Sequence, residues 1–193
     1  NPTKKPGTAL VLRGKQGTGK SIIVQIMRKL LGVHCVSLSK AGHFTGRFNS
    51  RLDKCLLLGA EEAFWAGDKE AEGVLKDLIT GDKHTIEFKN IDPIEMDNYI
   101  RVIITSNHHW VVPAGMEERR MAVFDVGDEH MQDHAYFAAM IQQMENGGYE
   151  ALMHHLQTLD ISGVNLRVVP MTQALFEQKM ENATDEMVVW HIG

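Results

Sequence analysis

The segment Gly14-Lys15-Gln16-Gly17-Thr18-Gly19-Lys20-Ser21 constrains the fold of this chain more than any other feature. Its spacing is G-x-x-x-x-G-K-[ST], and it lies between the apolar run 8–13 and a stretch, 21–31, with apolar residues at helical spacing. In such a loop, backbone N–H groups and the N-terminus of the following helix surround phosphate oxygens. The segment therefore predicts a strand, a phosphate-binding loop (P-loop) and a helix that ends at Gly32.

The residues of the P-loop have separate expected roles. Lys20 is expected to reach the β- and γ-phosphates of a nucleotide, and Ser21 is expected to bind Mg²⁺. Further contacts with the nucleotide are expected from the rest of the loop and the start of the helix, namely Gly14, Gln16, Gly17, Thr18, Gly19 and Ile22. ATP and Mg²⁺ are accordingly the expected cofactors.

Apolar strand-like runs alternate with helical patterns over the first two thirds of the chain. Strands are expected at 8–13, 33–38, 55–60, 99–105 and 121–126. An amphipathic helix is expected at 70–80, and the pattern from residue 131 onward is mostly helical. This alternation predicts an α/β fold with a mostly parallel five-stranded sheet flanked by helices. Ligands of such sheets bind beyond the carboxyl ends of the strands.

Composition and charge limit the class of protein. A chain of 193 residues with 44% hydrophobic content can bury one substantial core, and its apolar runs are too short to span a membrane. Cys35 and Cys55 lie in strand-like runs, which favours reduced thiols in the cytoplasm. The net charge of -5 argues against a globally basic nucleic-acid binder, although a motor can hold a strand with a few lysines. A start at Asn1 rather than Met suggests a segment of a longer protein.

Two polar clusters follow buried strands and complement the P-loop. Glu61-Glu62 follows the strand-like run that begins at Cys55. We expect Glu61 to hold the metal and Glu62 to act as general base for the attacking water, and the alternative is that Glu61 is the base. Asn107 follows the run 99–105, and its amide can both donate to and accept from a lytic water. The alternative interpretations are a solvated surface turn for the glutamates and a simple strand end for the asparagine.

An arginine pair precedes the last expected strand. Arg119 or Arg120 could stabilise charge on a γ-phosphate in the transition state, often from a neighbouring subunit. An ordinary exposed ion-pair region explains the two arginines equally well on physical grounds alone. The histidine groups 108–109, 130/134 and 154–155 lack cysteine partners at zinc-like spacing, so solvated or capping histidines are favoured.

The order of these motifs resembles superfamily 3 helicases, and in particular the helicase part of phage and plasmid primase-helicases. The resemblance covers roughly residues 8–126. It is carried by the following stretches: Gly14 to Ser21, Gly46-Arg-Phe-Asn49, Leu56 to Glu62, Leu75-Lys-Asp-Leu-Ile-Thr-Gly-Asp82, Ile103 to Asn107, and Glu118-Arg-Arg-Met121. It implies an AAA+ type P-loop NTPase fold, a ring that is usually hexameric, and ATP-driven movement along single-stranded DNA.

The resemblance also implies roles for individual residues. Asn107 would be the first sensor, and Arg120 would be the arginine finger that acts in trans, with Arg119 as the alternative. A hairpin at about 83–98 would point into the ring channel. Lys89 at its turn would touch DNA phosphate, with Lys83 as second choice. Such contacts give a sequence-independent grip on DNA.

We therefore expect residues 1–126 to form a P-loop ATPase core and residues 127–193 to form a helical C-terminal extension of the same domain. The leading hypothesis is the ATPase core of a replicative DNA helicase in the bacterial cytoplasm, encoded by a phage or other mobile element. A primase or polymerase domain would belong to the full-length protein. The alternatives are a P-loop kinase acting on a small molecule and an ATP-gated loader that assembles on DNA without unwinding it.

Overall fold

The structure is a computed structural model that describes residues 5–38, 49–61, 69–108 and 119–181. Its centre is a five-stranded sheet in which every pair of neighbouring strands is parallel. In spatial order the strands are β2 (Cys35–Leu38), β3 (Leu57–Glu61), β6 (Arg101–Ser106), β1 (Ala9–Arg13) and β7 (Met121–Asp125). The α/β class and the parallel five-stranded sheet expected from the sequence are confirmed.

Strand boundaries differ slightly from the expectation where a turn competes with the sheet. The second strand begins at Cys35 because Gly32–His34 forms a single turn of 3-10 helix. The third strand is shifted to Leu57–Glu61, which makes Glu61 its last residue. These shifts are small and leave the polar clusters at the carboxyl ends of the strands.

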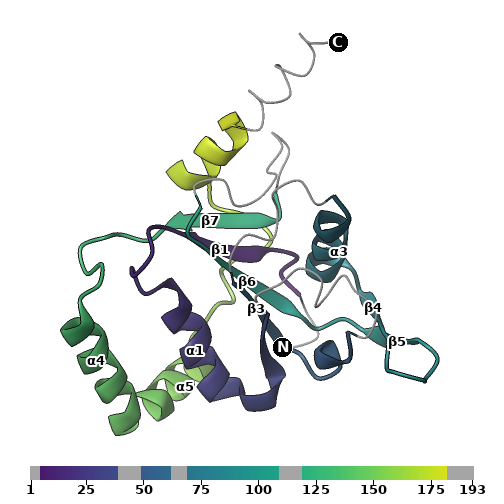
Figure 1. Ribbon diagram of the computed structural model, residues 1–193, viewed down its shortest axis with the longest axis horizontal. Helices are drawn as coiled ribbons and strands as arrows, with labels where there is room; N and C mark the ends of the chain where they lie inside the picture. The colour runs from purple at the N-terminus through teal and green to yellow at the C-terminus, as the bar shows by residue number, and fades with distance from the viewer. Residues whose placement is uncertain (1–4, 39–48, 62–68, 109–118, 182–193) are drawn as a thin grey trace.

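The two faces of the sheet are covered by different helices. On one face, alternate residues of the strands pack against α3 (Lys69–Thr80) and against the helix at residues 173–181. On the other face, Leu57 and Ile103 pack against Val24 of α1 (Lys20–Leu31). Figure 1 shows α1 together with α4 and α5, away from α3. Both faces are therefore covered, as the continuous apolar runs in the strands require.

Helix α1 lies unusually close to the sheet at Gly59. A Cβ atom added to Gly59 would stand 2.5 Å from Cγ1 of Val24 and 3.5 Å from its Cβ. Since Val24 is β-branched and held in a helix, rotation of its side chain cannot relieve that contact. The helix ends where expected: the N–H of Gly32, at φ 56°, donates to the carbonyl of Arg28.

An antiparallel hairpin, β4 (Lys83–Ile86) and β5 (Ile94–Asp97), extends from the body of the molecule. Both strands lie within the hairpin expected at about 83–98. Two asparagines attach it. Asn49 donates to the carbonyl of Thr85 (2.9 Å) and accepts from the N–H of Glu87 (2.8 Å). Buried Asn98 donates to the carbonyls at the end of α3. The base of the hairpin is therefore fixed to the body.

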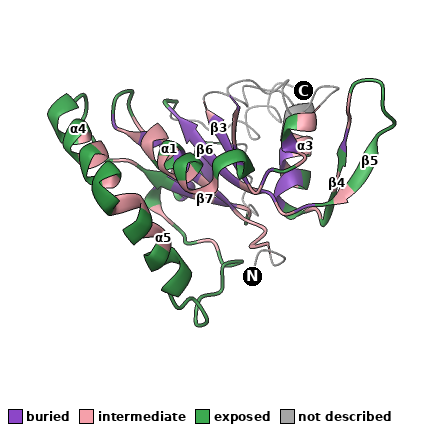
Figure 2. Ribbon diagram, turned by 90° about the horizontal axis from the view of Figure 1, so that it is seen from below, coloured by how far each residue is buried: buried purple, intermediate pink, exposed green. Residues whose placement is uncertain are grey.

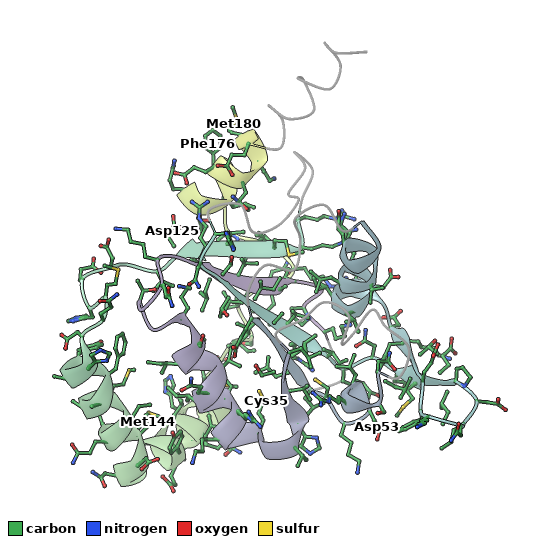
Figure 3. All side chains as sticks on the ribbon, in the orientation of Figure 1. Cys35, Asp53, Asp125, Met144, Phe176 and Met180 are labelled. Atoms are coloured by element: carbon green, nitrogen blue, oxygen red, sulfur yellow. The ribbon has the colours of Figure 1, made fainter. Side chains whose placement is uncertain are left out.

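The C-terminal part is helical with irregular connections. Helices α4 (His134–Gln143) and α5 (Tyr149–Thr158) have no buried residue and are mostly exposed in Figure 2. The helix at 173–181 is attached more firmly: Arg13 at the end of β1 pairs with both Asp125 and Glu177. Figure 3 shows Asp125 beneath the helix that carries Phe176. This ion pair lowers the pKa of the Glu177 carboxyl, because Arg13 donates a hydrogen bond to it.

Both cysteines are free and buried. Burial raises the pKa of the Cys55 thiol to about 12 and also raises that of Cys35, so neither is an activated thiolate. No helix in the described ranges is long and apolar enough to cross a membrane.

The close approach at Gly59 yields a stability prediction. Gly59→Ala is expected to lower the free energy of unfolding by about 1–3 kcal/mol, because the new methyl group overlaps Val24. Gly73→Ala is the matched control: Gly73 is exposed within α3 with no atom in contact range, so this change should stabilise by about 0.5–1 kcal/mol. Urea denaturation measures both, and equal effects of the two changes would contradict the packing argument.

Candidate nucleotide site

The P-loop joins β1 to α1 at the carboxyl end of the sheet. Gly17 (φ 85°) and Gly19 (φ 84°) adopt left-handed backbone conformations that favour glycine. Gly19 is also the residue that precedes α1, and no side chain caps the helix there. The N-terminus of α1 therefore faces the loop with backbone N–H groups, an arrangement suited to anions.

Lys20 is buried, and its ammonium group lies inside the loop. Its Nζ donates to the carbonyls of Gly14 (2.8 Å) and Lys15 (2.6 Å), and it lies 3.4 Å from Oγ1 of Thr18. Thr18 in turn donates to the carbonyl of Lys15 at 2.9 Å. The cation is thus held at the centre of the ring of backbone that a phosphate group would occupy.

A cavity of 310 Å³ opens beside the loop, and expected site residues that follow three different strands line it. Glu61 reaches it from the end of β3, and Asn107 reaches it from the end of β6. The lining residues are Gln16, Gly17, Gly19, Lys20, Ser21, Ile22, Glu61, Thr105, Ser106 and Asn107. The parallel pairing of β1, β6 and β3 explains this convergence, because it brings the three carboxyl ends to one edge.

The oxygen donors in this cavity suit a magnesium ion. Ser21 supplies a hydroxyl and Glu61 a carboxylate, and Mg²⁺ typically takes few protein ligands and completes its shell with water and phosphate. Ser37 on β2 donates to Oε1 of Glu61 at 2.9 Å and so orients the carboxylate. In the described part of the chain, no group of three His, Cys, Asp or Glu residues is placed to hold a metal.

Some expected residues fall outside what the structure describes. Glu62, the expected general base, lies in the undescribed segment 62–68. Of the stretch 46–49, only Asn49 is described. Ser37 was not anticipated, although a polar residue inside an apolar strand is a signal that could have identified it.

The segment that follows β7 packs against the P-loop along its length. A Cβ on Gly14 would stand 2.9 Å from the Val126 carbonyl oxygen, and one on Gly17 would stand 2.9 Å from Cγ of Gln132. The Gln132 N–H donates to the Gly17 carbonyl at 2.9 Å. Lys15 Nζ lies 2.6 Å from Asp128, a bond that lowers the pKa of the Asp128 carboxyl. Sequence reasoning missed this border of the loop.

Arg119 and Arg120 lie at the opposite end of the sheet from the P-loop. The carbonyl of Arg120 accepts from the N–H of Ala9, the first residue of β1, whereas the P-loop follows the last. Five strand residues span roughly 16 Å. The two arginines therefore do not join the P-loop cavity of their own chain.

The arginines line a second cavity, of 1020 Å³, together with two further cations, Lys5 and Arg167. Carboxylates of Asp82 and Asp97 border the same cavity. Lys5 donates to the carbonyls of Leu78 (2.7 Å) and Gly81 (3.0 Å). Burial, with a contribution from the charge of Arg101, lowers its pKa to about 8.

The two hairpin lysines differ in their surroundings. Lys83 Nζ lies 2.7 Å from Oε2 of Glu95 across the hairpin, whereas Lys89 is exposed in the connection 87–93 beside Asn90, whose φ is 61°. The hairpin and its connection also carry the four carboxylates Glu87, Asp92, Glu95 and Asp97. The hairpin is therefore acidic overall, and Lys89 at its tip is the better placed of the two cations for an external phosphate.

Comparison with known proteins identifies the family of the chain. Residues 12–120, which include the P-loop, Glu61, Asn107 and both arginines, match DUF5906, a family of unknown function. The chain belongs to this family. It is also 25% identical over 202 residues to the DNA Primase-polymerase of Nitratiruptor phage NrS-1, an alignment that covers 98% of this chain and 28% of that protein.

Solved structures share the fold. An A-form apo structure of the NrS-1 C-terminal region superimposes with a TM-score of 0.81 at 23% identity, covering 93% of this chain and 43% of the other. A second apo structure of that region gives a TM-score of 0.80 at 22% identity, covering 93% and 44%. The chain thus spans less than half the length of each of these relatives.

Proposed function

We propose that this chain is the ATP-hydrolysing core of a superfamily 3 DNA helicase with an AAA+ type P-loop NTPase fold. The observation that carries the proposal is the cavity in which Lys20, Ser21, Glu61 and Asn107 converge from three strands. A phosphate-binding loop alone suits many reactions. A loop faced by a carboxylate and an amide suits hydrolysis, which needs a metal and an oriented water.

Each residue of the cavity would have a distinct task. Lys20 would exchange its loop carbonyls for the β- and γ-phosphates, and Ser21 and Glu61 would hold Mg²⁺. Asn107 would orient the attacking water, and Glu62 would accept its proton. Bound Mg²⁺ would neutralise charge that develops on the phosphate oxygens.

The biological setting is proposed from the relatives. The NrS-1 protein is a DNA primase-polymerase of a phage, and this chain aligns with a part of it. A role in the replication of phage or mobile-element DNA follows for this chain, with a primase or polymerase domain elsewhere in the full-length protein. The helicase would move along single-stranded DNA.

The location of the arginines supports a ring, which we propose to be hexameric. Because Arg119 and Arg120 lie at the amino ends of the strands, either one could reach a γ-phosphate only in a neighbouring subunit. A head-to-tail interface would then bring the second cavity of one subunit to the P-loop of the next. Arg120 is the first candidate for the arginine finger, and Arg119 is the second.

The decisive test of the proposal is ATP turnover with and without single-stranded DNA. We expect DNA to stimulate turnover by the wild-type chain, and Lys20→Ala to lower it by roughly 100-fold or more because phosphate stabilisation is lost. Lys29→Ala, an exposed lysine at the far end of α1, is the matched control and should retain turnover. If DNA does not change the rate of ATP turnover and the phosphate is transferred to a small molecule, the chain is instead a kinase.

The trans arrangement predicts complementation between two inactive variants. Lys20→Ala and Arg120→Ala should each lose DNA-stimulated turnover when present alone. In an equal mixture, about a quarter of the interfaces would pair an intact P-loop with an intact arginine, so turnover should recover toward that fraction. A mixture no more active than its components would contradict a trans role for Arg120.

The hairpin predicts a difference between its two lysines. Lys89→Ala should weaken DNA-stimulated turnover more than basal turnover, because it removes the exposed cation at the tip. Lys83→Ala should have a smaller effect, since Glu95 already pairs with Lys83. Measuring both as a function of salt concentration tests the assignment, and a larger effect of Lys83→Ala would reverse it.

A further inference from the structure

The position of the expected metal and γ-phosphate ligands fixes the direction in which a nucleotide would lie. Glu61 and Asn107 both stand on the β6 side of the P-loop strand β1. On the other side of β1, the one strand among the described residues is β7. If the γ-phosphate points toward Glu61 and Asn107, as the proposed function on which this inference rests requires, the ribose and base leave toward β7.

The residues that follow β7 form the border of the P-loop on that side. Gln132 contacts Gly17, as described above, and Phe137 contacts Gly19. Two ring carbons of Phe137 lie 2.5 and 2.8 Å from the position of a Cβ on Gly19. Ile22, which lines the P-loop cavity, also lies beside that position, at 3.5 Å. The ring of Phe137 therefore stands directly outside the loop that would hold the phosphates.

An aromatic pair extends outward from Phe137. The Tyr136 ring meets the Phe137 ring edge-on at 5.3 Å between centroids, and it stacks on His130 at 3.7 Å with an interplanar angle of 1°. Tyr136 is 43% exposed. Asp133 holds both members: its carboxylate accepts from the N–H of Tyr136 at 2.9 Å and lies 3.6 Å from Nδ1 of His130. His130 and Tyr136 thus form an exposed aromatic surface that is separated from the P-loop by the ring of Phe137.

We propose that the His130–Tyr136 pair is the base-binding platform of the nucleotide site and that it selects purines by stacking. A stacked base gains contact area with a π face, and the gain depends on ring size more than on the pattern of donors and acceptors at the base edge. ATP and GTP should therefore bind with similar affinity, and CTP should bind more weakly. Inorganic tripolyphosphate, which has no base, should bind most weakly.

The test is a calorimetric titration, in the presence of Mg²⁺, with the β,γ-imido analogues of ATP, GTP and CTP and with tripolyphosphate. Tyr136→Ala keeps a good helix former at that position of α4 and removes the stacking surface. We expect it to weaken binding of the ATP analogue roughly tenfold while affinity for tripolyphosphate stays unchanged. Tyr136→Trp should retain wild-type affinity, because it keeps an aromatic face.

Phe176→Ala is the matched control, since Phe176 is a similarly exposed aromatic residue, at 50%, and does not line the P-loop cavity. It should leave all four affinities unchanged. Equal loss of ATP analogue and tripolyphosphate affinity in Tyr136→Ala, or no loss of either, would overturn the platform while leaving the phosphate site intact. If the wild-type chain binds neither ligand, the proposed function fails and the platform fails with it.

Discussion

The placement of β1 between β6 and β7 is the constraint on which the rest of the structure depends. Parallel hydrogen bonding on both sides aligns Arg13 of β1 with Ser106 and with Asp125. This register brings the end of β6, the P-loop and the segment after β7 to one edge of the sheet. Asn107 thereby stands on one side of the loop and Gln132 on the other. The same register sends Arg119 and Arg120 to the opposite edge.

Arg13 connects this central strand to the C-terminal part of the chain. It is buried at the entrance to the P-loop and pairs with a carboxylate of β7 and with one of the helix at 173–181. Removing one partner of a buried charge is costly because the remaining charge is left without compensation. The ion pairs of Arg13 therefore anchor the start of the P-loop, and the segment 126–137 packs against the loop itself. Helices α4 and α5 have no buried residue of their own.

Sequence reasoning recovered the elements whose signals are local. The P-loop spacing, the helix stop at Gly32 and the polar ends of β3 and β6 are written in short stretches of sequence, and the structure brings Lys20, Ser21, Glu61 and Asn107 to one cavity. Contacts between distant segments could not be read in this way. Nothing in the pattern around Ser37 reveals Glu61 as its partner. His130 is exposed, as its interpretation as a solvated histidine expects, but its stacking on Tyr136 was not foreseen, because the turns at 128–133 bring the two rings together.

The topology of the sheet also has a consequence for how the chain folds. The strands of the five-stranded sheet pair over long stretches of sequence: Ala9 of β1 pairs with Met121 of β7, and Leu10 pairs with Ile103, while the shortest separation is between Cys35 of β2 and Leu57 of β3. The one described strand pairing between close neighbours is the hairpin β4–β5. Such long-range pairing makes folding slow. Because β1 gains its second neighbour only when β7 is present, the loop 14–21 acquires its final shape late, after the chain has extended past Asp125.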